Sequence, residues 1–158
     1  MSGVLLDRAA LAALIPHQGN MCLLDAVLAW DAQSIHCQAR THRDPQHPLA
    51  VDGELAALNL IEYGAQAMAV HGGLLARTGG GVAAPGVLAL VREVRFEVAR
   101  IDDIEADLDV RAQRLVATES GWLYAFDVHV GPRLLAQGRV AVINASSADE
   151  TSDTTGAT

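Results

Sequence analysis

Two histidines and one glutamate stand where they could share a proton-transfer reaction. His42 and His47 lie in a stretch marked by Pro45 and Pro48, and Glu62 follows inside a long, mainly apolar segment. A neutral imidazole is a suitable base for taking a proton from carbon. A carboxyl group enclosed by apolar side chains stays protonated near neutrality, because burial disfavours its ionised form. These residues therefore predict acid–base chemistry, with Glu62 as the proton donor.

The segment that carries Glu62 has the apolar spacing of a helix. Between Glu54 and Ala76, apolar residues recur at steps of three and four, at Leu55, Leu58, Ile61, Ala65, Met68 and Ala69. Few polar residues interrupt this pattern, so we expect one long helix that is buried almost all round. Glu62 is accordingly predicted to lie in the core.

Strands are predicted on both sides of this helix. Residues 21–30 and 34–40 form two apolar runs joined by a short turn. Four further segments alternate apolar and polar residues with a period of two, as antiparallel strands with one face on a core do: 88–98, 105–112, 123–130 and 133–143.

The remaining segments predict short or irregular structure. Residues 7–14 indicate a short helix with Asp7 as its N-cap. The glycine-rich stretch 78–86 predicts a flexible connection. Residues 144–158 hold no large apolar side chain and predict a disordered tail behind a single domain over 1–143.

The composition excludes several classes of protein. Of 158 residues, 51% are hydrophobic, the net charge is −8, and all 11 basic residues are arginines. The absence of lysine excludes Schiff-base chemistry, and the acidic balance argues against a nucleic-acid partner. The N-terminus has neither the basic region of a signal peptide nor the apolar length of a membrane span, which predicts a cytoplasmic protein without a membrane contact.

Cysteine and histidine spacing gives no sign of a metal site. Cys22 and Cys37 fall in the predicted strands, and two cysteines in a cytoplasmic chain most often are reduced, buried thiols. No tight ligand spacing such as HExxH occurs, so no bound metal is expected.

The predicted order of elements resembles the hotdog fold. In this α+β architecture a curved antiparallel sheet wraps one central helix, and two subunits usually pair; a helix this apolar must be covered by a sheet. "LIPHQGNMCLLDAVLAW" (14–30) resembles the opening of the 3-hydroxyacyl-[acyl-carrier-protein] dehydratases. "LIEYGAQAMAVHG" (60–72) resembles their central helix, and "GRVAVI" (138–143) their last strand. The resemblance covers residues 10–143 and is nearest in character to the aryl-polyene-type branch.

The resemblance implies elimination of water from a 3-hydroxyacyl thioester. A histidine would take a proton from C2, and Glu62 would protonate the leaving hydroxyl. Gln66, four residues after Glu62 as in the family, would contact the substrate. Free amides near Gly53, at the predicted first turn of the helix, would bind the thioester oxygen.

The resemblance also implies the partners. The phosphopantetheine arm belongs to acyl carrier protein, so no cofactor is expected on this chain. A homodimer or higher homo-oligomer is expected, with the acyl chain in a tunnel along the central helix. Since both proteins are acidic, carrier docking would need a local arginine pair, either Arg92 with Arg95 or Arg40 with Arg43.

The sequence leaves the choice of histidine open. His42 matches the family's motif histidine by its neighbours, because prolines and a second histidine follow in similar order. His47 matches better by its distance from Glu62. The proline-glycine that precedes the helix in the family is replaced here by Asp52-Gly53. His17 is a third candidate, although its counterpart in the housekeeping enzymes is not the base.

Other interpretations of the same residues stay open. One is a thioesterase, in which a carboxylate on the central helix activates water. Another is a non-catalytic chain that binds acyl groups or pairs with an active homologue. Each residue also has a structural alternative: an arginine partner or a subunit boundary for Glu62, solvent-facing loop positions for His42 and His47, a loop anchor for His17, a backbone contact for Gln66, and a helix-dipole partner for His71.

Overall fold

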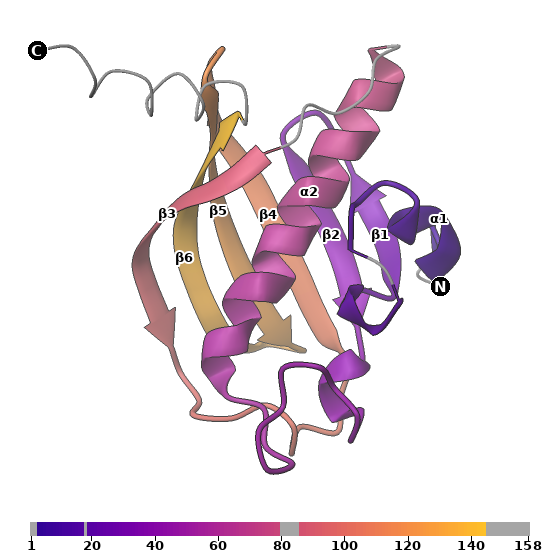
Figure 1. Ribbon diagram of the computed structural model, residues 1–158, viewed down its shortest axis with the longest axis vertical. Helices are drawn as coiled ribbons and strands as arrows, with labels where there is room; N and C mark the ends of the chain where they lie inside the picture. The colour runs from indigo at the N-terminus through magenta and orange to yellow at the C-terminus, as the bar shows by residue number, and fades with distance from the viewer. Residues whose placement is uncertain (1–2, 18, 80–85, 145–158) are drawn as a thin grey trace, which may run out of the picture.

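One antiparallel sheet of six strands curves around a long helix, α2 (Figure 1). The structure, a computed structural model, describes residues 3–17, 19–79 and 86–144. The elements are α1 (Arg8–Ala12), β1 (Ala26–Trp30), β2 (Ser34–Ala39), α2 (Leu60–Thr78), β3 (Gly86–Phe96), β4 (Leu108–Ala117), β5 (Gly121–Val130) and β6 (Arg133–Asn144), with 3-10 turns at Gly19–Met21, Thr41–Arg43 and Ala57–Asn59. The predicted flexible connection lies largely outside the described residues, as does the predicted tail beyond Asn144.

The strand order is β1-β2-β4-β5-β6-β3, so β1 and β3 form the two edges of the sheet. The β1 edge is partly occupied, because the backbone N–H of Leu5 donates to Val27 O at 2.9 Å and that of Val27 donates to Leu6 O at 2.9 Å. The outer edge of β3 pairs with no other strand among the described residues.

The predicted alternation is confirmed in β4 and β5. Val110, Ala112, Phe126 and Val128 are buried beneath α2, and Phe126 is in register with Ala112 on one side and Gly138 on the other. Intervening polar residues such as Arg111 lie on the opposite face of the sheet. This is the pattern of a sheet with one face on a core.

The helix begins later than its apolar spacing predicts. Asp52 and Gly53 both have positive φ, 53° and 77°, as the central residues of a type I′ turn do. Val51 and Glu54 close this turn with reciprocal backbone hydrogen bonds of 2.9 and 3.0 Å. The Asp-Gly pair therefore makes a reversal rather than a helical turn, and α2 starts only at Leu60.

Both cysteines are free and buried, but only Cys37 lies in a strand. Burial raises the pKa of the Cys37 thiol to about 12 and also raises that of Cys22. The prediction of a strand from residue 21 is wrong, because β1 starts at Ala26. No helix within the described residues is long and apolar enough to span a membrane.

Helix α2 lies close against the sheet at Gly64. A Cβ atom added there would lie 2.7 Å from two atoms of the Phe126 side chain, whereas one added at Gly72 meets nothing within 4 Å. We expect Gly64→Ala to lower the free energy of unfolding by about 1–3 kcal/mol, because an overpacked core must shift. Gly72→Ala should raise it by about 0.5–1 kcal/mol through helix propensity. Urea unfolding of both variants tests this, and equal effects at the two positions would contradict the close contact.

Candidate functional site

The polar side chains of the first turns of α2 lie on two different sides of the helix. Tyr63 and Gln66, three residues apart and therefore on one face, are 0% and 1% exposed. Glu62 is exposed. The prediction that Glu62 lies in the core is wrong for the single chain, because the sheet covers only one side of the helix. Within the described residues Glu62 makes no hydrogen bond or ion pair with His17, His42 or His47.

His42 is buried and keeps one nitrogen free. It is 1% exposed, and its Nε2 lies 2.9 Å from the carbonyl oxygen of Ile104. Since a carbonyl only accepts, Nε2 carries the proton and Nδ1 carries a lone pair. Nδ1 is buried without a hydrogen-bond partner. Burial lowers the pKa of His42, against the opposing effect of the Ile104 carbonyl, so the ring is held neutral in the tautomer of a general base.

His47 has both nitrogens engaged. Its Nδ1 accepts a hydrogen bond from the Leu49 N–H at 3.1 Å, so the neutral ring carries its proton on Nε2, 3.1 Å from the Tyr63 hydroxyl. Burial is the main cause of its lowered pKa. Of His42 and His47, the two candidates for the family's motif histidine, only His42 has a ring nitrogen with an unused lone pair.

Gln66 binds the backbone that leads into β1. Its Oε1 accepts from the Leu23 N–H at 2.8 Å, and its Nε2 donates to the Met21 carbonyl at 2.6 Å. The backbone contact that sequence left as an alternative is therefore present. A direct contact between Gln66 and substrate, predicted from the family, remains a prediction.

Two other predicted site residues lie away from this cluster. Gly53 sits in the turn before α2, and the next amide, that of Glu54, already donates to Val51 O. The prediction that Gly53 marks the first helical turn is therefore wrong, and the free-amide argument built on it loses its support. His17 is half-buried ahead of the turn Gly19–Met21, with a buried Nδ1 that has no partner among the described residues.

Sequence reasoning missed two residues, Tyr63 and Thr41, that the structure brings into the cluster. The Tyr63 hydroxyl lies 2.8 Å from Thr41 Oγ1, and Thr41 in turn donates to Leu23 O at 2.6 Å. Tyr63 directly follows Glu62 and Thr41 directly precedes His42, so adjacency to the candidate residues was the available signal.

His71 is not the helix-dipole partner that its position near the helix end predicts. It is 0% exposed, with Nδ1 2.8 Å from the Tyr124 hydroxyl and Nε2 2.8 Å from the Asp31 carbonyl. Burial lowers the pKa of His71 and raises that of Tyr124 to about 12. The second His–Tyr pair of the molecule thus ties α2 to β5 and to the turn after β1.

Three buried histidines predict loss of stability in acid. Burial lowers the pKa of His42, His47 and His71 in the folded chain below the ordinary value of 6.5. As the pH falls through 6.5, these histidines become protonated in the unfolded chain but stay neutral in the folded chain, because their pKa is lower there. Acid therefore favours unfolding. We expect the free energy of unfolding, and with it the urea midpoint, to fall as the pH is lowered from about 7.5 to 5.5. A midpoint that is constant over this range would contradict the neutral, buried rings.

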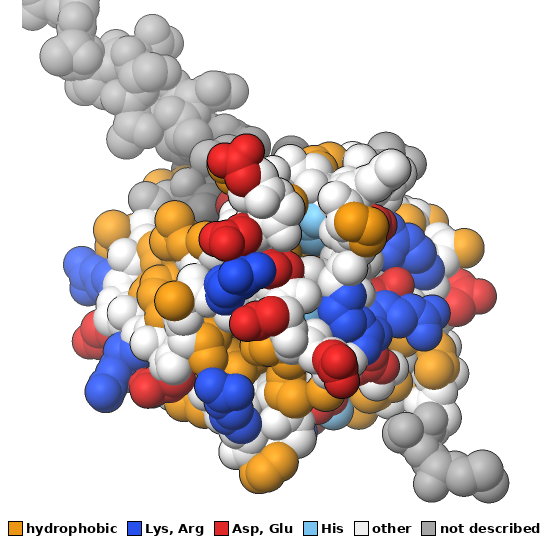
Figure 2. Space-filling view, turned by 90° about the horizontal axis from the view of Figure 1, so that it is seen from below, with side chains coloured by type: hydrophobic (Ala, Val, Ile, Leu, Met, Phe, Trp, Pro, Cys, Tyr) orange, Lys and Arg blue, Asp and Glu red, His pale blue; other side chains and the backbone are white. Residues whose placement is uncertain are grey.

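Charged side chains at the lower end of the molecule neutralise one another. Figure 2 shows acidic and basic groups interspersed there rather than gathered by sign. Arg100 pairs with Glu54 at 3.1 Å and with Asp102, and Arg43 pairs with Asp107 at 2.6 Å. No group of three potential metal ligands occurs among the described residues.

The sheet wrapped around a central helix defines a hotdog-fold protein. The sequence profile of the ApeP-like family, described as ApeP dehydratase, matches residues 9–153, and the chain belongs to this family of aryl-polyene dehydratases. No curated protein sequence matches the chain significantly.

Solved structures share the fold. A chain of the dehydratase heterocomplex ApeI:P from Xenorhabdus doucetiae superposes with a TM-score of 0.79 at 24% identity, over 90% of this chain and 97% of that one. Zebrafish thioesterase superfamily member 2 superposes with a TM-score of 0.60 at 18% identity, over 87% of this chain and 94% of that one. A putative thioesterase from Silicibacter superposes with a TM-score of 0.59 at 13% identity, over 90% of this chain and 94% of that one.

Proposed function

We propose that the protein dehydrates 3-hydroxyacyl chains carried on acyl carrier protein, as part of an assembly of two hotdog chains. The observation that carries this is His42: a buried neutral imidazole with one nitrogen held by a backbone carbonyl and the other nitrogen unused. Membership of a dehydratase family supports the reaction class.

The reaction balances with two groups of the protein. Nδ1 of His42 takes the proton from C2 of the acyl chain. The electron pair released forms the C2–C3 double bond as the C3–O bond breaks. The carboxyl group of Glu62 gives its proton to the departing oxygen, which leaves as water. The lone pair of His42 and the proton of Glu62 must therefore face the same substrate.

The two-chain assembly follows from the exposure of Glu62. A carboxyl group acts as an acid near neutrality when its surroundings are apolar, and α2 of a single chain leaves Glu62 in water. A second chain would supply the missing cover. The relative from Xenorhabdus doucetiae, which belongs to a heterocomplex, favours a related hotdog chain over a second copy.

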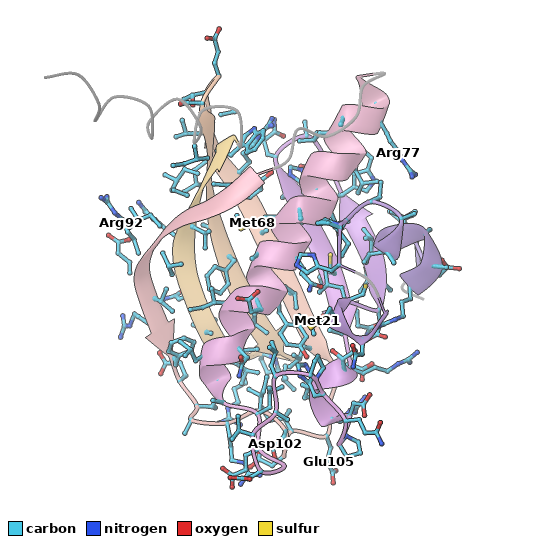
Figure 3. All side chains as sticks on the ribbon, viewed as in Figure 1. Met21, Met68, Arg77, Arg92, Asp102 and Glu105 are labelled. Atoms are coloured by element: carbon cyan, nitrogen blue, oxygen red, sulfur yellow. The ribbon has the colours of Figure 1, made fainter. Side chains whose placement is uncertain are left out.

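Arg92 and Arg95 are the better candidates for carrier docking. Arg43 is already bound to Asp107 and to the Glu105 carbonyl, and Arg40 faces Asp25 at 4.0 Å. Arg92 and Arg95 are exposed on β3 and make no ion pair with the described residues, and Arg92 points away from the sheet in Figure 3. An acidic carrier helix could approach these two side chains without displacing an existing ion-pair partner.

The test is an assay with and without a second hotdog chain. The purified protein, alone and mixed with an ApeI-type dehydratase, is incubated with 3-hydroxyacyl carrier protein, and loss of water is followed by mass spectrometry. The ApeI-type chain is also assayed by itself. Enoyl product that requires this protein supports the proposal, and its absence in every mixture overturns it. A thiol-trapping reagent in the same reaction would reveal thioester hydrolysis instead.

A second candidate is a non-catalytic subunit that supports an active partner. The lack of a hydrogen bond or ion pair between Glu62 and the three histidines, within the described residues of one chain, favours it. In that case the mixture would form enoyl product while variants of His42 and Glu62 in this chain kept the full rate.

A further inference from the structure

Tyr63 is the centre of a hydrogen-bond chain in which every proton has a determined place. The carbonyl of Leu23 only accepts, so the one O–H of Thr41 points to it. Thr41 Oγ1 must then accept from the Tyr63 hydroxyl, and Tyr63 must accept from Nε2–H of His47. The Leu49 N–H fixes the same tautomer from the other side of the ring.

The chain joins four separate segments at one buried point. It connects the loop of His47, the turn of Thr41, helix α2 and the backbone at Leu23. Gln66, on the same face of α2 as Tyr63, holds the N–H of Leu23 while Thr41 holds its carbonyl. Tyr63 is 0% exposed, and burial raises the pKa of its hydroxyl, so the phenol stays protonated.

The two candidate catalytic residues are sequence neighbours of this chain. Glu62 precedes Tyr63 on α2, and His42 follows Thr41 in the turn Thr41–Arg43. A shift of Tyr63 moves the helix position of Glu62, and a shift of Thr41 moves the backbone that carries His42. Placement errors of about 1 Å can cost about 100-fold in rate.

We infer that Tyr63 is a positioning residue for the dehydration: its hydroxyl, bound between His47 and Thr41, sets the placement of His42 relative to Glu62. This rests on the proposed function and deepens it. His47 then serves as a neutral donor that holds Tyr63, rather than as the base.

The second His–Tyr pair supplies a matched control. Tyr124 is also buried on the helix side of the sheet and bonds His71 at 2.8 Å, but it has neither candidate catalytic residue as a neighbour in sequence. Tyr63→Phe and Tyr124→Phe each remove one buried hydroxyl that bonds one histidine. A purely structural role predicts similar losses of stability and similar activity for the two variants.

The experiment compares kcat and KM of the active assembly containing each variant. We expect Tyr63→Phe to lower kcat by about 10-fold or more with KM within about two-fold, since positioning acts after binding. Tyr124→Phe should keep kcat. Thr41→Ser, which retains the hydroxyl, should keep kcat, while Thr41→Val should lower it as Tyr63→Phe does.

Failure of this inference differs from failure of the proposed function. Equal kcat in the wild-type, Tyr63→Phe and Tyr124→Phe assemblies overturns the inference and leaves the dehydratase intact. An inactive wild-type assembly overturns both. Nitrogen NMR of His47 adds a readout without turnover: a proton found on Nδ1 rather than Nε2 overturns the hydrogen-bond chain itself.

Discussion

Replacing His42 with glutamine is expected to remove most of the dehydratase activity, with kcat falling by about 10²–10⁴-fold. The amide of glutamine can still donate to the Ile104 carbonyl, which now lies 2.9 Å from the imidazole, but it offers no basic nitrogen. The fold should therefore persist while the base is lost. Steady-state turnover of 3-hydroxyacyl carrier protein, with a thermal melt of each variant, measures the two effects separately.

Two other histidines serve as controls for this substitution. His36 lies on the outer face of the sheet, 2.8 Å from Asp109, and His36→Gln should leave kcat unchanged. His47→Gln should reduce kcat less than His42→Gln, because His47 acts only through Tyr63. Full activity of His42→Gln together with loss of activity in His47→Gln or His17→Gln would assign the base to the other residue.

Replacing Glu62 with glutamine is expected to lower kcat by about 10²-fold or more without destabilising the isolated chain. Glutamine matches glutamate in shape but cannot give up a proton to the leaving hydroxyl. Glu62 is exposed and makes no ion pair with the described residues, so its replacement should change the free energy of unfolding by less than about 0.5 kcal/mol. Turnover of the assembly and urea unfolding of the single chain test the two halves of this prediction.

Glu97→Gln, another exposed carboxylate without an ion pair among the described residues, is the matched control and should keep kcat. If Glu62→Gln retained the full rate in a mixture that forms enoyl product, the acid would come from the second chain. This chain would be the non-catalytic subunit only if His42→Gln kept the full rate as well.

The strands could be predicted because their alternation arises only from burial against the core of the same chain. The burial of Glu62 could not be predicted, because apolar spacing on a helix arises both from such a core and from a surface that another chain covers. Every inward residue of β5, such as Phe126, faces the same sheet-covered core. On the helix, the apolar residues at steps of three and four include some that face the chain's own sheet and others that do not. Leu58, in the 3-10 turn just before α2, is 63% exposed, and Glu62 follows it by four residues. An exposed apolar residue near an exposed carboxylate is consistent with a surface that another chain covers. The sequence of one chain does not distinguish such a surface from the core.

The site was only partly predictable for a related reason. His42, His47 and Gln66 could be chosen from residue type and motif, and the backbone alternative for Gln66 proved right. For Tyr63 the sequence offers only its position next to Glu62, because its role depends on Thr41 and His47, which lie 22 and 16 residues away in sequence. Which nitrogen of each histidine carries the proton depends on contacts with Leu49 and Ile104. The Ile104 carbonyl lies 62 residues from His42 in sequence, so no local pattern fixes that contact.

The unequal edges of the sheet limit how far the protein can assemble. A strand edge with unpaired amides and carbonyls is a template for another strand, and a sheet with two such edges can extend without end. Here residues 5 and 6 already occupy part of the β1 edge, whereas the outer edge of β3 pairs with no strand among the described residues. A chain with one unpaired strand edge can pair through that edge with one neighbour, and the pair then has no further unpaired edge. We therefore expect growth through the sheet to end at a closed pair instead of a fibre.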